Sequence, residues 1–120
     1  MPKFVEDDKI MQGDQKITGV PVYQDAGINA DGDRVLLVYD TVLFQADPDI
    51  KENITIATDG SDFNALAAAD TVSVVGKYIV IDFDSALSTA TNKIKVAKES
   101  VVSVSGDFNA EVTTDAIDAS

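Results

Sequence analysis

The side chains best suited to chemistry lie in an acidic stretch at residues 25–33, which reads DAGINADGD. Asp25, Asn29, Asp31 and Asp33 carry hard oxygen ligands at close, alternating spacing. Calcium binds about six to eight oxygens and tolerates irregular geometry, so such a loop suits it. These four residues are therefore a candidate calcium site, and calcium is the one cofactor that the sequence suggests.

The same loop has a simpler interpretation as a surface turn, in which Asp, Asn and Gly adopt positive φ and form Asx hydrogen bonds. An EF-hand is excluded. A register with Gly32 as the loop glycine would put Gly27 at the first ligand position and Val38 at the last, and neither coordinates as required. The sequence leaves both the calcium site and the simple turn open.

The amino-acid types present in the chain give little support for a catalytic function. The chain has no His and no Cys, so the usual bases and nucleophiles are missing. No GxSxG, phosphate-cradling glycine loop or Ser-x-x-Lys motif is present. The chain has 21 acidic residues, so some carboxylates must lie close together, and such a pair is little evidence of a catalytic site. We predict a non-catalytic protein with no catalytic residues.

Composition and charge narrow the class of partner. The 120-residue chain has a net charge of −12, which argues against electrostatic binding to nucleic acid or to an anionic membrane. Its 45% hydrophobic content is enough for one globular domain, and no apolar run approaches the ~20 residues of a membrane helix. The acidic start, MPKFVEDDKI, is no signal peptide, which predicts either a protein that stays inside the cell or a segment of a longer precursor.

The sequence predicts short strands joined by turns, and any functional site must be built on these strands and turns. Residues 71–75 and 78–83 flank Gly76-Lys77, which predicts a hairpin with a type II′ turn. Residues 34–39 form the most apolar run and predict a central strand, buried on both faces. Further strands are expected at 15–24, 53–57, 93–96, 101–104 and 110–114. We expect a loop at 25–33 and a helical turn at 63–69. The connection at 40–49 is expected to pack Val42, Leu43 and Phe44 onto the core.

This spacing predicts an all-β fold, an immunoglobulin-like β-sandwich of about seven short strands. We expect an N-terminal arm or edge strand at 1–14, the sandwich at 15–114 and a C-terminal tail or linker at 115–120. The aromatic residues divide by periodicity into a core group and a partly exposed group that could mark a contact surface. The core group is Tyr39, Phe63 and Phe83, and the exposed group is Tyr23, Tyr78 and Phe108.

Several segments together resemble the bacterial Ig-like repeats of S-layer and other large cell-surface proteins. They are DAGINADGDRVLLVYDTVL, NITIATDGSDFNAL, DTVSVVGKYIVIDFDSAL and STATNKIKVA, which span about residues 22–104. The chain departs from the family at Tyr39-Asp40, where Phe-Ser is usual, and at residues 105–109, where the usual Asp-x-x-Gly-Asn turn is altered. The resemblance implies an extracellular scaffold, spacer or adhesive module.

Three functions follow as hypotheses. The first is a structural or adhesive module of an extracellular or surface-layer protein, which binds neighbouring domains or subunits and is stabilised by calcium at residues 25–33. The second is an Ig-like decoration or tail-surface module of a phage virion, because such products lack signal peptides. The third is a carbohydrate-binding module, which predicts exposed aromatic side chains in a row and a glycan partner.

Overall fold

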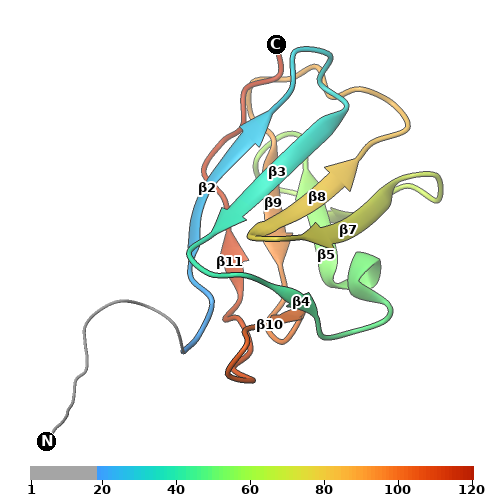
Figure 1. Cartoon of the computed structure of the whole chain (residues 1–120). Helices are drawn as coiled ribbons and strands as arrows, with labels where there is room; N and C mark the ends of the chain where they lie inside the picture. Colours follow the sequence, from blue (N-terminus) through green and yellow to red (C-terminus); the bar gives the residue numbers. More distant parts are fainter. Residues whose placement is uncertain (1–18) are drawn as a thin grey trace, which may run out of the picture.

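The computed structural model describes residues 19–120, and the arm expected at residues 1–14 lies outside them. Its first sheet has four antiparallel strands in the order β2-β3-β8-β7 (Figure 1). β3 is central, paired with β2 on one side and β8 on the other. The bounds are Tyr23–Ile28 for β2, Arg34–Tyr39 for β3, Tyr78–Asp82 for β8 and Thr71–Val75 for β7.

The second sheet also has four antiparallel strands, in the order β11-β9-β5-β6. A separate two-stranded ribbon pairs β4 with β10. The bounds are Val112–Thr113 for β11, Lys93–Val96 for β9, Ile54–Ala57 for β5, Asn64–Ala65 for β6, Phe44–Gln45 for β4 and Val101–Val102 for β10.

Both sheets contribute to one hydrophobic core. The alternation of each strand turns one face inward, as period-two geometry requires. Leu37 and Ile79 from the first sheet and Ile54, Ile94 and Val96 from the second are fully buried in the same cluster. The fold is therefore all-β and sandwich-like, which confirms the all-β part of the predicted class.

The central hairpin follows the sequence prediction closely. β7 and β8 pair from Val75 opposite Tyr78, leaving Gly76-Lys77 as the two-residue turn. Gly76 has φ +58° and Lys77 has no positive φ, which fits type II′. As expected, Ile79 and Ile81 face the core.

Residues 25–28 differ from their sequence prediction. They are the last four residues of β2, not a loop, and Ala26 to Ile28 pair with Leu37 to Val35 of β3. Asp and Gly have weak strand preference, but pairing with an apolar central strand overrides that preference. Only Asn29 to Asp33 form the turn that joins β2 to β3.

The helical turn expected at residues 63–69 is also replaced. Asn64–Ala65 is strand β6, paired with Thr55 and Ile56 of β5, while the short 3₁₀ helix η1 lies at Ile50–Asn53. Ala-rich composition favours a helix only weakly, and the open edge of β5 offers backbone hydrogen bonds that a single helical turn cannot match.

The C-terminal segment belongs to the folded unit in the structure, where the sequence predicted a tail or linker at 115–120. Ile117 is 6% exposed and forms an isolated β-bridge with Asn92. The Asn92 side chain donates to the carbonyl of Ile117, and the Ile117 N–H donates back to the Asn92 carbonyl. Within residues 19–120, no helix is long and apolar enough to cross a membrane.

Candidate interaction surface

The exposed large hydrophobic side chains gather at one end of the sandwich, which we call the apolar end. It is the end where β3 finishes and β2 and β8 begin (Figure 1). Backbone hydrogen bonds join the segments there: Tyr39 N–H donates to the Lys77 carbonyl and Leu43 N–H to the Gly76 carbonyl. Within residues 19–120 the exposed set is Val20, Val22, Val42, Phe44, Val75, Tyr78, Val104 and Phe108.

Two aromatic side chains at the apolar end share one face of a small ribbon. Val102 of β10 is paired with Phe44 of β4 and forms a bridge with Phe108. Directly opposed residues in antiparallel strands point to the same face, so Phe44 and Phe108 flank Val102 on that face. Two strand spacings separate their backbones, about 10 Å. Phe44 is 51% exposed and Phe108 is 48% exposed, so both rings are open to solvent on this ribbon of β4 and β10, which we call the aromatic ribbon.

The ribbon sits on a buried polar anchor, Asn109. Its side-chain oxygen accepts hydrogen bonds from the backbone N–H groups of Ser100 (2.8 Å) and Val101 (3.0 Å). Its amide nitrogen donates to the carbonyls of Ala97 (3.0 Å) and Ala110 (2.9 Å). Asn109 is 2% exposed, so this one side chain satisfies four backbone groups and holds β10 against the chain leading to β11.

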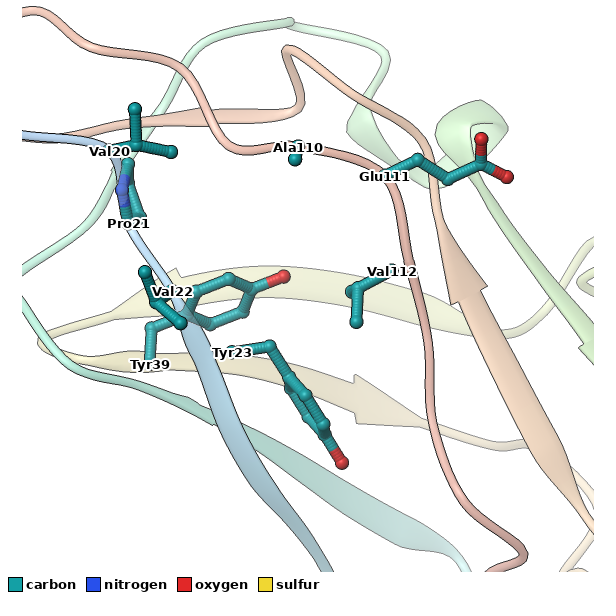
Figure 2. A pocket seen from close by; sticks show the side chains of 8 residues that line it. All are labelled: Val20, Pro21, Val22, Tyr23, Tyr39, Ala110, Glu111 and Val112. Atoms are coloured by element: carbon teal, nitrogen blue, oxygen red, sulfur yellow. The ribbon is translucent and has the colours of Figure 1, made fainter.

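A cleft opens at the same end, between the start of β2 and the approach to β11 (Figure 2). Each of these is the edge strand of its own sheet. The cleft has a volume of about 220 Å³. It is lined by Val20, Pro21, Val22, Tyr23, Tyr39, Ala110, Glu111 and Val112. In Figure 2 the Glu111 side chain extends away from the cleft, so the walls are largely apolar.

Tyr39 stands at the base of this cleft. Its ring packs edge-to-face on Tyr23, with centroids 6.0 Å apart. Its hydroxyl is a buried polar atom with no hydrogen-bond partner among the described residues, and it points toward Val112 in Figure 2. Burial, reinforced by Tyr23, raises the pKa of Tyr39 to about 12, so the hydroxyl keeps its proton at neutral pH.

The structure separates the predicted calcium ligands. Asp25 lies within β2, opposite Val38, four residues before Asn29. At about 3.3 Å per residue, that distance is roughly 13 Å. Asn29 and Asp33 do meet, since the Asn29 amide donates to the Asp33 carboxylate at 2.7 Å. No cluster of three or more carboxylates suited to a metal occurs in residues 19–120.

Asn29 acts as a turn-forming side chain in this hairpin. Its side-chain oxygen accepts from the backbone N–H groups of Asp33 and Arg34, each at 3.0 Å. Its carbonyl also accepts from the N–H of Gly32. The oxygen proposed as a calcium ligand is therefore already engaged, and the observed bonds fit the simple turn. Calcium binding at Asp25, Asn29, Asp31 and Asp33 stays a prediction.

Melting experiments separate the two interpretations of this turn. We expect Asn29→Ala to lower the melting temperature by several degrees, because two backbone N–H groups lose their acceptor at about 1 kcal/mol in total. We expect Asp31→Ala and the exchange of millimolar calcium for chelator to change it by less than about one degree. A calcium-dependent rise that Asp31→Ala abolishes would instead establish the metal site.

Sequence reasoning found part of this surface. It expected Tyr78 and Phe108 to be partly exposed, and both are, at 41% and 48%. It missed Phe44, because Val42, Leu43 and Phe44 were expected on the core and only Leu43 is buried. Alternation along 42–44 was the available signal, since adjacent residues of an extended chain cannot all face inward.

Comparison with known proteins supports the fold of this chain and does not identify its function. No protein-family model and no curated protein matches the chain. A structural similarity does exist, with a TM-score of 0.59, to a carbohydrate acetylesterase from Xanthomonas citri. The match covers 82% of this chain but 23% of the esterase, at 16% identity. The chain therefore belongs to the class of small all-β, sandwich-like domains, and a similar fold occurs as a minor part of a longer enzyme.

Proposed function

We propose that this protein is a non-catalytic, immunoglobulin-like module that binds neighbouring β-sandwich domains through the aromatic ribbon of its apolar end. The observation that carries the proposal is the gathering of the exposed large hydrophobic side chains at that end. Contiguous exposed apolar surface on a folded domain marks interaction sites, whereas scattered exposed hydrophobic residues carry no such meaning.

The strand order supports the immunoglobulin-like assignment. With the separate ribbon of β4 and β10 set aside, naming the remaining strands in chain order makes β2, β3, β8 and β7 equivalent to A, B, E and D, and β11, β9 and β5 equivalent to G, F and C, with β6 as an added strand beside C. Immunoglobulin constant-type domains have these two groupings, A-B-E-D and C-F-G. A domain of this kind is a rigid spacer that presents its ends to adjacent domains.

The setting of this module is also a proposal. The resemblance of about residues 22–104 to surface-layer repeats supports an extracellular assembly of neighbouring domains. A virion decoration module would use the same kind of surface. The two differ in repeat content, because a surface-layer protein carries several such domains in one reading frame.

Self-association tests the ribbon, with a second copy of the domain as the model partner. We expect the protein to associate as concentration rises from micromolar to millimolar. Sulfate should strengthen the contact, because excluded salts strengthen apolar burial and also screen the net charge of −12. The double variant Phe44→Ser/Phe108→Ser should weaken association by about tenfold or more. Sedimentation equilibrium measures this effect.

The matched control is Ala90→Ser. Ala90 is exposed in the connection between β8 and β9 and is not one of the exposed large hydrophobic side chains of the apolar end, so its substitution should leave association unchanged. All three substitutions are at exposed positions, and circular dichroism should show an unaltered fold. A wild-type protein that remains monomeric at every concentration, with or without sulfate, contradicts the proposal of a domain partner.

A carbohydrate-binding function is a second candidate, favoured by the same aromatic pair. The two exposed rings lie on one face, and their backbones are about 10 Å apart, so the rings would stack on two units of one sugar chain. The esterase that contains a similar fold is named for acting on carbohydrate, which gives this candidate its substrate class. Glycan-array binding that Phe44→Ser/Phe108→Ser abolishes would support it, and silence across the array would remove it.

A further inference from the structure

The outer face of the first sheet carries apolar side chains that the aromatic ribbon does not explain. Alternate residues of β3, β8 and β7 point away from the core, and the strand register makes them neighbours. Leu36 of β3 lies opposite Val80 of β8. Val38 of β3 lies opposite Tyr78 of β8, which lies opposite Val75 of β7. These five side chains form one contiguous apolar group.

This face is open to solvent in the described part of the chain. Leu36, Val38 and Val80 are half-buried, and none of them belongs to the hydrophobic core or to the side chains packed against it. Tyr78 is 41% exposed and Val75 is 59% exposed. Figure 1 shows the sheet from this side, with the second sheet behind it. The solvent face of an antiparallel sheet is normally polar, so an apolar group there marks an interaction surface.

The composition of β3 also indicates a covered outer face. The run RVLLVY predicted a strand buried on both faces. On the inner face Val35, Leu37 and Tyr39 are buried, whereas on the outer face Leu36 and Val38 are half-buried. A partner packed on the outer face would complete the burial that the residue types predict.

The charges on this face favour a second copy of the chain as that partner. Within the four strands, the charged side chains on this side are Asp25 at the edge and Arg34 and Asp82 at one end. The face is therefore close to neutral, although the chain has a net charge of −12. Two copies repel each other through most of their surface, and this face lets them approach with little repulsion.

Arg34 and Asp82 form an ion pair that can also bind its own copy. The Arg34 Nε donates to one carboxylate oxygen of Asp82 at 2.6 Å, and Nη2 donates to the other at 3.3 Å. The two side chains are 56% and 40% exposed. Arg has more N–H donors than these two bonds use, and a carboxylate accepts more bonds than it receives here. Two such pairs, placed head to tail, would satisfy each other.

We propose that two copies of this chain pack through the outer faces of their β2-β3-β8-β7 sheets, about a two-fold axis that runs along the strands between β3 and β8. This axis places β3 over β8 of the second copy, so Arg34 meets Asp82 of the second copy and the reverse contact forms as well. Leu36 likewise lies over Val80 of the second copy. A two-fold contact of this kind is self-complementary and closes as a dimer. Facing sheets pack about 10 Å apart with their strands aligned within about 30°.

The shape of the face suits this arrangement. A hollow of about 200 Å³ lies beside β2, lined in part by Gly27, Arg34 and Leu36. Gly27 leaves it open, since a Cβ there would meet no atom within 4 Å. The two-fold axis lays the edge strand β7 of the second copy over β2, with Ser73 of the second copy near Gly27. The missing side chain therefore gives the second copy room to approach closely.

The size of the face indicates a weak dimer. β2 and β7 are separated by about 14 Å, three strand spacings. A stable complex usually buries about 800 Å² on each partner, more than a face of this width supplies. We therefore expect a dissociation constant on the order of a millimolar. This inference does not rest on the proposed function, because β3 and β8 lie outside the aromatic ribbon.

Complementary charge reversals test the dimer in the Phe44→Ser/Phe108→Ser background, which removes the ribbon contact. Arg34→Asp leaves two negative charges on the face, and Asp82→Arg leaves two positive charges. Each variant alone should stay monomeric at millimolar concentration, because like charges then face each other. An equal mixture of the two should associate at least about tenfold more strongly than either variant alone. Sedimentation equilibrium measures this, and ¹⁵N NMR of one labelled variant should show shifts at Leu36 and Val80.

The matched control replaces Arg34→Asp by Lys98→Asp. Lys98 is exposed between β9 and β10, outside the face, and its substitution changes the net charge equally. Its mixture with Asp82→Arg should form no heterodimer. An exposed ion pair contributes about 0–1 kcal/mol, so the charge variants should keep their fold, which circular dichroism checks.

Three outcomes would overturn the proposed dimer. They are a Phe44→Ser/Phe108→Ser protein that stays monomeric at millimolar concentration, charge variants that dimerise as well singly as in the mixture, and a heterodimer that forms equally with Lys98→Asp. The proposed function fails by a different result, namely a Phe44→Ser/Phe108→Ser protein that associates as strongly as the wild type.

Discussion

Replacing Asn109 with Ala should cost about 3 kcal/mol of unfolding free energy and lower the melting temperature by roughly 10–20 °C. The substitution removes the acceptor for the N–H groups of Ser100 and Val101 and the donor for the carbonyls of Ala97 and Ala110. A buried backbone group that loses its partner bears the full cost of desolvation. Urea unfolding followed by circular dichroism measures the change.

Two further variants show whether those bonds are responsible. Asn64→Ala is the matched control, because Asn64 is exposed and donates one side-chain bond, to the Asp62 carbonyl, so it should cost less than about 0.5 kcal/mol. Asn109→Asp keeps the acceptor but loses both donors and puts a charge in a buried site, so it should destabilise about as much as Asn109→Ala. A cost for Asn109→Ala below about 1 kcal/mol would show that water replaces the side chain easily.

Gly32→Ala should be the second large effect, at about 2–3 kcal/mol. Gly32 has φ +76°, a region that side-chain-bearing residues adopt at a cost of about 1–2 kcal/mol. A Cβ there would lie 2.7 Å from the carbonyl oxygen of Leu87, a backbone atom that cannot swing aside. The Leu87 N–H donates to the Gly32 carbonyl at 2.8 Å, so relieving the clash disturbs this backbone contact.

Gly76→Ala is the matched control for this prediction. Gly76 has φ +58° in a hairpin turn, but a Cβ there would meet no atom within 4 Å. It should therefore cost only the conformational term, about 1 kcal/mol. Hydrogen exchange at Leu87 should accelerate in Gly32→Ala and stay unchanged in Gly76→Ala. Equal costs for the two substitutions would contradict the role given to the Leu87 contact.

The amino-acid sequence determined the parts of the fold that depend on neighbours along the chain. The hairpin from Thr71 to Asp82 was predictable because Gly76 at the first turn position and period-two alternation specify it locally. The inward faces of Ile79 and Ile81, and of Ile94 and Val96, followed from the same alternation. Residue types alone excluded imidazole and thiolate chemistry, because the chain has no His and no Cys.

The tertiary structure decided everything that depends on which segments meet. Asp25 lies in a strand because it pairs with Val38 of β3. Phe44 is exposed because the adjacent Leu43 is the residue that faces the core. The predicted calcium ligands were close in sequence, but an extended strand carried Asp25 away from Asn29. The apolar end combines residues from 20 to 108, and the burial of the Tyr39 hydroxyl depends on the packing of the folded chain around it. Burial and hydrogen-bond satisfaction are properties of contacts between distant segments, so local pattern alone does not contain them.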